Sequence, residues 1–150
     1  MGIKGSSTCV MNFDGAVGYM VGKPHQGLAA MFTMMNYERL SIGIQGIGCG
    51  EMSYQNAVRY AKDRLQGRAA HGAANPQGVA DPIIHHADIR RLLLTQRAWN
   101  EASRAFAVYV GLQLDLANYH PDHDTTVKAA QRVALLTPVA KAFFTDKGFD

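Results

Sequence analysis

Cysteine, proline and tryptophan are scarce in this sequence, and long apolar runs are missing. Of its 150 residues, two are cysteine, five are proline and one is tryptophan. Cys9 and Cys49 lie far apart and form no Cys-x-x-Cys motif, which argues against a disulfide framework and favours buried free thiols in a reducing cytoplasm. No apolar stretch reaches the roughly 18 residues of a membrane-spanning helix, and the first residues lack the features of a signal peptide. We therefore expect a cytoplasmic protein without a membrane span.

Charge of either sign is also modest. Lys and Arg total 15 and Asp and Glu total 12, which gives a formal net charge of +3. The basic residues form no run and no helix interleaved with aromatic residues, so the pattern does not indicate a nucleic-acid-binding protein. A mildly basic surface suits an anionic ligand such as a nucleotide phosphate. The sequence has no GxGxxG, P-loop or GxSxG motif, which argues against nicotinamide, ATP and serine-hydrolase functions.

The first 22 residues are expected to form a β-hairpin. Residues 9–13 are mostly apolar, Asp14 and Gly15 are a turn signal, and residues 16–21 form a second apolar-rich run. A hairpin alone is marginally stable in water, so this one is expected to pack on another part of the molecule. Glycine and proline in residues 22–27 predict a loop.

A long helix is expected over residues 28–65, because their apolar positions recur close to every 3.6 residues. Within this stretch lie four glycines, each of which costs up to about 1 kcal/mol in a helix: Gly43, Gly46, Gly48 and Gly50. Two interpretations stay open. Either the glycines mark a close backbone approach to a neighbouring helix or ligand, or the helix is looser and kinked there.

Two further helices are predicted after a flexible connection. That connection is residues 67–82, which are rich in glycine, alanine and proline. Periodicity predicts a second helix near residues 89–116, and a third that starts at residues 124–126 and runs to about 145, kinked at Pro138. The three helices predict a mainly α, up-down bundle preceded by the hairpin. Because such bundles usually have four helices and both ends look cut, we expect a fragment of a larger protein.

Several segments, in this order, resemble the acyl-CoA dehydrogenase family. Residues 1–28 resemble the end of its middle β-domain, and residues 34–40 look like the start of the first helix of its C-terminal domain. Residues 60–68 are similar to the family's ARERxQFGR segment, although Gln66 is followed directly by Gly67 without the usual aromatic residue. Residues 81–94 look like the branch that includes 3-methylmercaptopropionyl-CoA dehydrogenases, which also looks shortened after the glutamine.

The resemblance implies a domain division and an activity. Residues 1–26 would end a middle β-domain, and residues 27–150 would be a truncated C-terminal helical bundle domain. The implied reaction is α,β-dehydrogenation of an acyl-CoA thioester, in which a carboxylate base removes the α-proton and FAD accepts the β-hydrogen as hydride. An electron-transfer flavoprotein is the implied electron acceptor, and the fragment would be inactive in isolation.

The resemblance also implies candidate site residues. Glu38, followed by Arg39, matches the base of the isovaleryl and long-chain branches. In most of the family the base lies in a later Tyr-Glu-Gly-Thr motif, and Glu38 would then be a pocket-wall carboxylate paired with Arg39 or another cation. Arg39 matches an arginine near the substrate and base, where its guanidinium could position a carboxylate; the alternative is an exposed helix arginine.

Arg64 and Gln66 match residues that contact the adenosine diphosphate part of FAD across a subunit interface. An arginine suits phosphate because its planar fork donates hydrogen bonds in pairs. Since the two residues would come from one subunit and most of the flavin site from another, the resemblance implies a homodimer or homotetramer.

Two other classes of function stay open. The same scaffold could carry an acyl-CoA oxidase or a flavin monooxygenase. A non-enzymatic helical module could instead self-associate through the glycine-rich helix and a methionine-rich face. The histidines at 85–86 and 120–123 have neither a cysteine nor a helical His-x-x-x-His pair beside them, so we expect loop or cap roles for them and no metal site.

Overall fold

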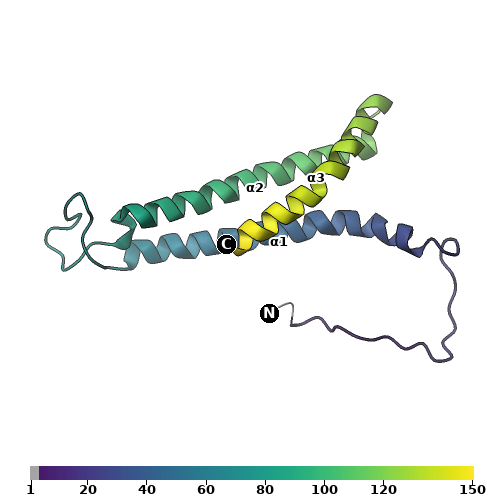
Figure 1. The fold of residues 1–150 in the computed structure, drawn as a ribbon, viewed down its shortest axis with the longest axis horizontal. Helices are drawn as coiled ribbons and strands as arrows, with labels where there is room; N and C mark the ends of the chain where they lie inside the picture. The colour runs from purple at the N-terminus through teal and green to yellow at the C-terminus, as the bar shows by residue number, and fades with distance from the viewer. Residues whose placement is uncertain (1–3) are drawn as a thin grey trace.

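The computed structural model describes residues 4–150, and three long α-helices dominate this part of the chain (Figure 1). Helix α1 spans Gly27–Asp63, α2 spans Ala87–Tyr119 and α3 spans His123–Phe149, while a short 3-10 helix, η1, spans Ile83–His85. α1 and α2 run antiparallel side by side, and α3 returns from the far end of α2 across both of them. The expected mainly α, up-down bundle is confirmed.

The start of α3 shows how local chemistry sets a helix boundary. We expected residues 124–126 to start the helix, but Asp122 is the capping residue. Its carboxylate accepts hydrogen bonds from the Thr125 hydroxyl at 2.6 Å and from the Thr125 N–H at 2.9 Å. An aspartate at this position satisfies a backbone donor that the helix leaves unpaired. The same two bonds, the hydroxyl first, lower the pKa of Asp122.

The β-hairpin expected over the first 22 residues is not formed in the described part of that segment. Residues 4–26 contain no strand, and they run as an exposed chain away from the helices (Figure 1). A turn does occur at Gly15, where φ is 67°. The apolar side chains of Val17 and Tyr19 are 86% and 91% exposed. A hairpin needs a surface on which to bury one face, and this segment buries none. Residues 1–3, also assigned to the hairpin, lie outside the described residues.

The glycines of α1 mark its contact with α3. A Cβ atom added at Gly43 would lie 2.9 Å from Cδ2 of Phe144, and one added at Gly46 would overlap the Phe144 carbonyl. On the other helix, a Cβ at Gly148 would overlap the backbone of Gly46. Gly48 is different, because nothing lies within 4 Å of its added Cβ. Of the two interpretations, close approach to a neighbouring helix is therefore the correct one, and α1 continues unbroken through these glycines.

Phe144 is the centre of a small core where the three helices meet. Its side chain is 1% exposed, and it packs with Ile47 of α1, Val110 of α2 and Ala140 of α3. The ring of Phe106 meets it edge-on, with the ring centroids 5.5 Å apart. Burying an aromatic side chain of this size stabilises a fold by about 1.5–3 kcal/mol. This cluster therefore anchors α3 to the α1–α2 pair.

The two cysteines are free, as expected, but they are exposed rather than buried. Cys9 belongs to the exposed N-terminal segment, and Cys49 lies on the outer side of α1. Burial was expected because it is the usual environment of a free cysteine. Within residues 4–150, none of the helices is long and apolar enough to cross a membrane.

Candidate functional site

Arg39 lines a groove near the N-terminal end of α1. The groove has a volume of about 530 Å³ and lies between α1, the last turns of α2 and the first half of α3. Arg39 is half-buried, and its guanidinium lies over the ring of Phe32, 5.6 Å from the ring centroid. α2 and α3 contribute apolar side chains to the lining, among them Leu114, Val133 and Ala134. The groove therefore combines an apolar wall with one cation.

Glu38 precedes Arg39 in the sequence but does not line this groove. Successive residues of a helix do not face each other, so the two side chains leave α1 in different directions. Glu38 is exposed and forms no ion pair with the residues that the structure describes. The structure therefore does not show the pairing of Glu38 with Arg39 that was one alternative for this carboxylate.

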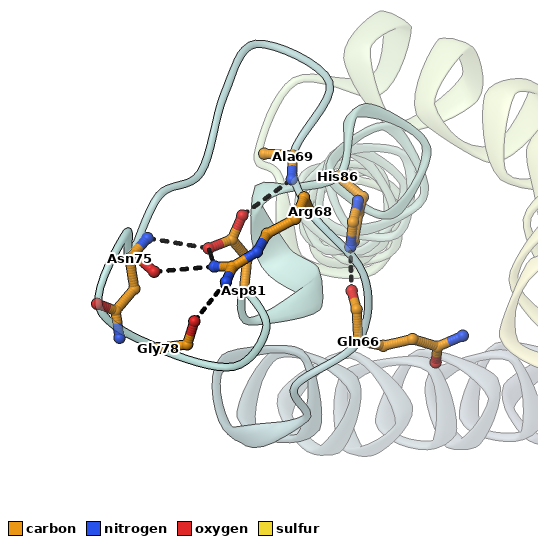
Figure 2. A network of polar contacts seen from close by, with 7 residues as sticks. All are labelled: Gln66, Arg68, Ala69, Asn75, Gly78, Asp81 and His86. Carbon is orange, nitrogen blue, oxygen red and sulfur yellow. Dashed lines mark hydrogen bonds and ion pairs between the residues drawn. The ribbon is translucent and has the colours of Figure 1, made fainter.

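Residues 64–86, which link α1 to α2, form an ordered connection rather than the flexible one we expected (Figure 2). The N–H of Gln66 donates to the carbonyl of Asp81 at 3.0 Å, and the N–H of Asp81 donates to the carbonyl of Gly67 at 2.9 Å. The first of these bonds, together with the one from the Ile83 N–H to the Arg64 carbonyl at 2.9 Å, forms an antiparallel bridge between Leu65 and Pro82. Nε2 of His86 lies 2.7 Å from the Gln66 carbonyl oxygen. The residues that follow α1 are thus held against those that precede η1.

A buried carboxylate, that of Asp81, organises the rest of this connection. Its side chain is 0% exposed. Oδ1 accepts hydrogen bonds from the Asn75 N–H at 2.9 Å and from Nη1 of Arg68 at 3.3 Å, and Oδ2 accepts one from the Ala69 N–H at 2.9 Å (Figure 2). Arg68 also donates to the carbonyls of Asn75 and Gly78. The hydrogen bond from Ala69, followed by that from Asn75, holds the pKa of Asp81 well below its usual range.

Arg64 and Gln66 lie on the exposed side of the connection. The backbone at Arg64 is extended, with φ −71° and ψ 119°, and side chains two residues apart in extended chain point to the same side. Both residues are exposed, and in Figure 2 the Gln66 side chain points away from Asp81. Within residues 4–150, neither side chain forms a hydrogen bond or an ion pair. A guanidinium and an amide are therefore presented to solvent on a backbone that is held in place.

The two pairs of sequence-predicted site residues lie far apart along α1, with Glu38 and Arg39 in its first half and Arg64 and Gln66 just after its C-terminal end. At a rise of about 1.5 Å per residue, the helix from Arg39 to Arg64 is about 37 Å long. The structure therefore brings Arg64 and Gln66 close to each other, but it separates them from Glu38 and Arg39 within one chain.

Two of the six histidines, His86 and His120, take part in local hydrogen bonds through their side chains. Besides the contact of His86 described above, Nδ1 of His120 accepts a hydrogen bond from the Asp122 N–H at 3.1 Å. In the part of the chain that the structure describes, no three His, Cys, Asp or Glu side chains gather as a set of metal ligands.

Asp81 is the main residue that the sequence analysis missed. It entered only as part of the resemblance of residues 81–94. A usable signal was present, because Asp81 is the sole acidic residue between positions 64 and 87 and Arg68 lies in the same stretch. One carboxylate among many small residues has backbone N–H groups available as donors and no acidic competitor.

The sequence of the chain was compared with family models and with curated proteins, and only the curated proteins gave matches. No family model matches the chain. It is 41% identical over 150 residues to 3-methylmercaptopropionyl-CoA dehydrogenase of Ruegeria pomeroyi and 34% identical over 154 residues to a broad-specificity linear acyl-CoA dehydrogenase of Mycobacterium tuberculosis. A butyryl-CoA dehydrogenase of Syntrophomonas wolfei is 33% identical over 154 residues. These matches cover 97–100% of the chain and 25% of each relative.

The chain folds as a helical bundle with an ordered connection, and its sequence matches acyl-CoA dehydrogenases over 97–100% of its length. The chain belongs to the acyl-CoA dehydrogenase family, and the resemblance stated from its sequence is confirmed. It spans about a quarter of the length of the curated relatives that it matches.

Proposed function

We propose that this chain is part of an FAD-dependent acyl-CoA dehydrogenase, an oxidoreductase that introduces an α,β double bond into an acyl-CoA thioester. The observation that carries the proposal is the 33–41% identity to three acyl-CoA dehydrogenases over nearly the whole chain. Residues 27–150 would be the first part of a C-terminal helical domain, and residues 1–26 the end of the domain before it. The chain in isolation would be inactive, because it supplies one wall of the cavity.

The exposed side of the connection suits a flavin nucleotide. A guanidinium donates paired hydrogen bonds to phosphate oxygens, and a side-chain amide both donates and accepts. Because the backbone that carries Arg64 and Gln66 is already held, little ordering is needed when a ligand binds. We propose that these two residues bind the adenosine diphosphate part of FAD. When bound, FAD supplies the acceptor for the hydride that leaves the β-carbon.

The length of α1 supports an oligomer. Arg39 and Arg64 are about 37 Å apart along the helix, so the two residues would not line one compact site within a single chain. We therefore propose that Arg64 and Gln66 reach the FAD of a neighbouring copy, in a homodimer or homotetramer.

We further propose that an electron-transfer flavoprotein accepts the electrons. We also propose that the enzyme is cytoplasmic, as the free exposed thiols of Cys9 and Cys49 suggest.

Near the thioester, Arg39 and Glu38 have different tasks in this proposal. Arg39 lines a largely apolar groove that would accept part of the acyl-CoA, and its guanidinium orients a carboxylate through paired hydrogen bonds. Glu38 has an exposed carboxylate that forms no ion pair with residues 4–150, and it is the candidate base for the α-proton. The alternative base is a glutamate that lies later in the enzyme.

Flavin binding by the complete enzyme tests the proposal. The enzyme is expected to purify with FAD as a yellow protein that loses its colour when acyl-CoA is added without oxygen. Arg64→Ala is expected to raise the Kd for FAD by about tenfold or more, because a hydrogen bond to a charged group contributes about 1.5–3 kcal/mol. Arg59→Ala removes another exposed arginine of α1 and should leave the Kd unchanged. A colourless enzyme that takes up no FAD would exclude the proposed function.

Admission of air to the bleached enzyme separates the dehydrogenase from an acyl-CoA oxidase or a flavin monooxygenase. A dehydrogenase that passes its electrons to another protein should regain its colour slowly. Rapid return of the colour, with formation of hydrogen peroxide, would instead assign the protein to the oxidases.

A further inference from the structure

We propose that Asp81 is a positioning residue for the flavin nucleotide: its buried carboxylate holds the segment that carries Arg64 and Gln66 in the shape that binds the adenosine diphosphate part of FAD. This inference rests on the proposed function, because Asp81 acts only through those two residues. Within residues 4–150, Asp81 makes no hydrogen bond to either of their side chains. It is therefore not a catalytic residue.

Backbone hydrogen bonds connect Asp81 directly to the segment that carries the two side chains. Asp81 exchanges bonds with Gln66 and Gly67, at 3.0 Å and 2.9 Å, and two residues later the N–H of Ile83 donates to the Arg64 carbonyl at 2.9 Å. Residues 64, 66 and 67 are thus each bonded to residues 81–83. A displacement of Asp81 would therefore move the backbone beneath Arg64 and Gln66.

The carboxylate determines where Asp81 lies. A buried carboxylate remains charged only when its oxygens accept hydrogen bonds, and here both oxygens do so, from Arg68 and from the N–H groups of Ala69 and Asn75. These donors come from residues 68–75, which fold around the carboxylate on the side away from the Gln66 side chain (Figure 2). The loop is thereby kept off the exposed side of the connection, where the nucleotide would bind.

The negative charge is essential because the three groups that bond to the carboxylate oxygens, Nη1 of Arg68 and the N–H groups of Ala69 and Asn75, are all donors. Asparagine has nearly the shape of aspartate, but its NH₂ group would face one of these donors and lose that bond. Asp81→Asn therefore preserves the volume of the side chain and disrupts the cluster. A matched control is Asp88→Asn, because the Asp88 carboxylate is 71% exposed and pairs with Arg91 at 2.8 Å on the surface of α2.

The complete enzyme is used for the test, as wild type, Asp81→Asn, Arg64→Ala, the double variant and the Asp88→Asn control. The Kd for FAD is measured by quenching of flavin fluorescence, and kcat and KM for acyl-CoA are measured at saturating FAD. Asp81→Asn is expected to raise the Kd about tenfold, with kcat and KM at saturating FAD changed less than about twofold. In the Arg64→Ala background the effect of Asp81→Asn is expected to shrink, because residues that act through one another are not additive.

The outcomes separate this inference from the function on which it rests. If Arg64→Ala raises the Kd and Asp81→Asn does not, the positioning role is overturned and the proposed function stands. Full additivity in the double variant also overturns it, because Asp81 would then act independently of Arg64. A wild-type enzyme without affinity for FAD removes the proposed function and this inference together. Should Asp81→Asn fail to fold, Arg68→Met removes one of the three donors and must also raise the Kd for FAD.

Discussion

Gly46 of α1 and Gly148 of α3 meet backbone to backbone. A side chain on Gly148 would overlap the Gly46 carbonyl, and one on Gly46 would overlap the Phe144 carbonyl. Residues without side chains let two helix backbones approach closely, and close approach increases the number of dispersion contacts between them. The glycines that weaken α1 as an isolated helix are therefore the residues that permit it to pack against α3.

Gly46→Ala is expected to destabilise the protein by about 1–3 kcal/mol, since the added methyl group overpacks the contact with α3. Gly48→Ala is the matched control on the same helix, because nothing lies within 4 Å of its added Cβ. It should be neutral or stabilise by up to about 1 kcal/mol, as alanine is the better helix former. Urea denaturation measures both changes. Equal effects of the two substitutions would contradict the assigned helix contact.

Phe144→Ala is expected to cost about 3–5 kcal/mol, because it removes a buried aromatic side chain and leaves a cavity at the meeting point of the three helices. Phe149 lies on the same helix but is 82% exposed. Phe149→Ala should therefore stay within about 0.5 kcal/mol of the wild type. Thermal unfolding followed by circular dichroism compares the two. A small change for Phe144→Ala would show that the core lies elsewhere.

The contribution of Asp81 to stability should depend on pH. Its pKa is lowered from 3.8 in the folded state, so the unfolded chain binds the proton more readily. A lowered folded-state pKa contributes stability that is fully present above about pH 4 and is lost as the pH falls towards the folded value. The difference in unfolding free energy between the wild type and Asp81→Asn should therefore be largest at neutral pH and narrow below about pH 4. A difference that does not vary with pH would mean that the carboxylate is not held as an anion.

In the complete enzyme, Glu38→Gln is expected to lower kcat by about 100-fold or more, the usual contribution of a general base. Binding of FAD should be unaffected, because the substitution leaves Arg64 and Gln66, the residues proposed to bind the nucleotide, unchanged. Glu101→Gln, at an exposed glutamate of α2 that pairs with Arg97, is the control and should retain turnover. Stopped-flow bleaching of the flavin by acyl-CoA measures the step. Unchanged turnover of Glu38→Gln would assign the base to a later glutamate.

Apolar periodicity located the helices but not their buried turns. On the periodic side of α1, Ile47 and Ala61 are buried, whereas Leu28 and Met31 are 69% and 41% exposed. Periodicity identifies a face of a helix, and burial additionally requires a partner surface. Here that surface is set by where α2 and α3 cross α1, which no local pattern encodes.

The candidate site, like the helices, was predictable from the sequence only in part. Family resemblance proposed Arg39, Arg64 and Gln66 as site residues, because the motifs that contain them are short and continuous in sequence. It did not show that Arg39 lines a groove while Glu38 points elsewhere. Nor did it indicate the role of Asp81, whose donors come from residues 6 to 13 positions away and meet it only when the connection folds back.

Local patterns were thus sufficient to predict the three helices, their order and the family. Periodicity, turn residues and motifs all depend on residues that are neighbours in the sequence. They failed for the N-terminal hairpin, where a suitable apolar pattern has no surface to cover. The glycine contact, the buried carboxylate and the separation of the two pairs of site residues were decided by the folded chain. Each depends on groups distant in sequence coming within van der Waals or hydrogen-bond distance, and that proximity exists only after the helices pack.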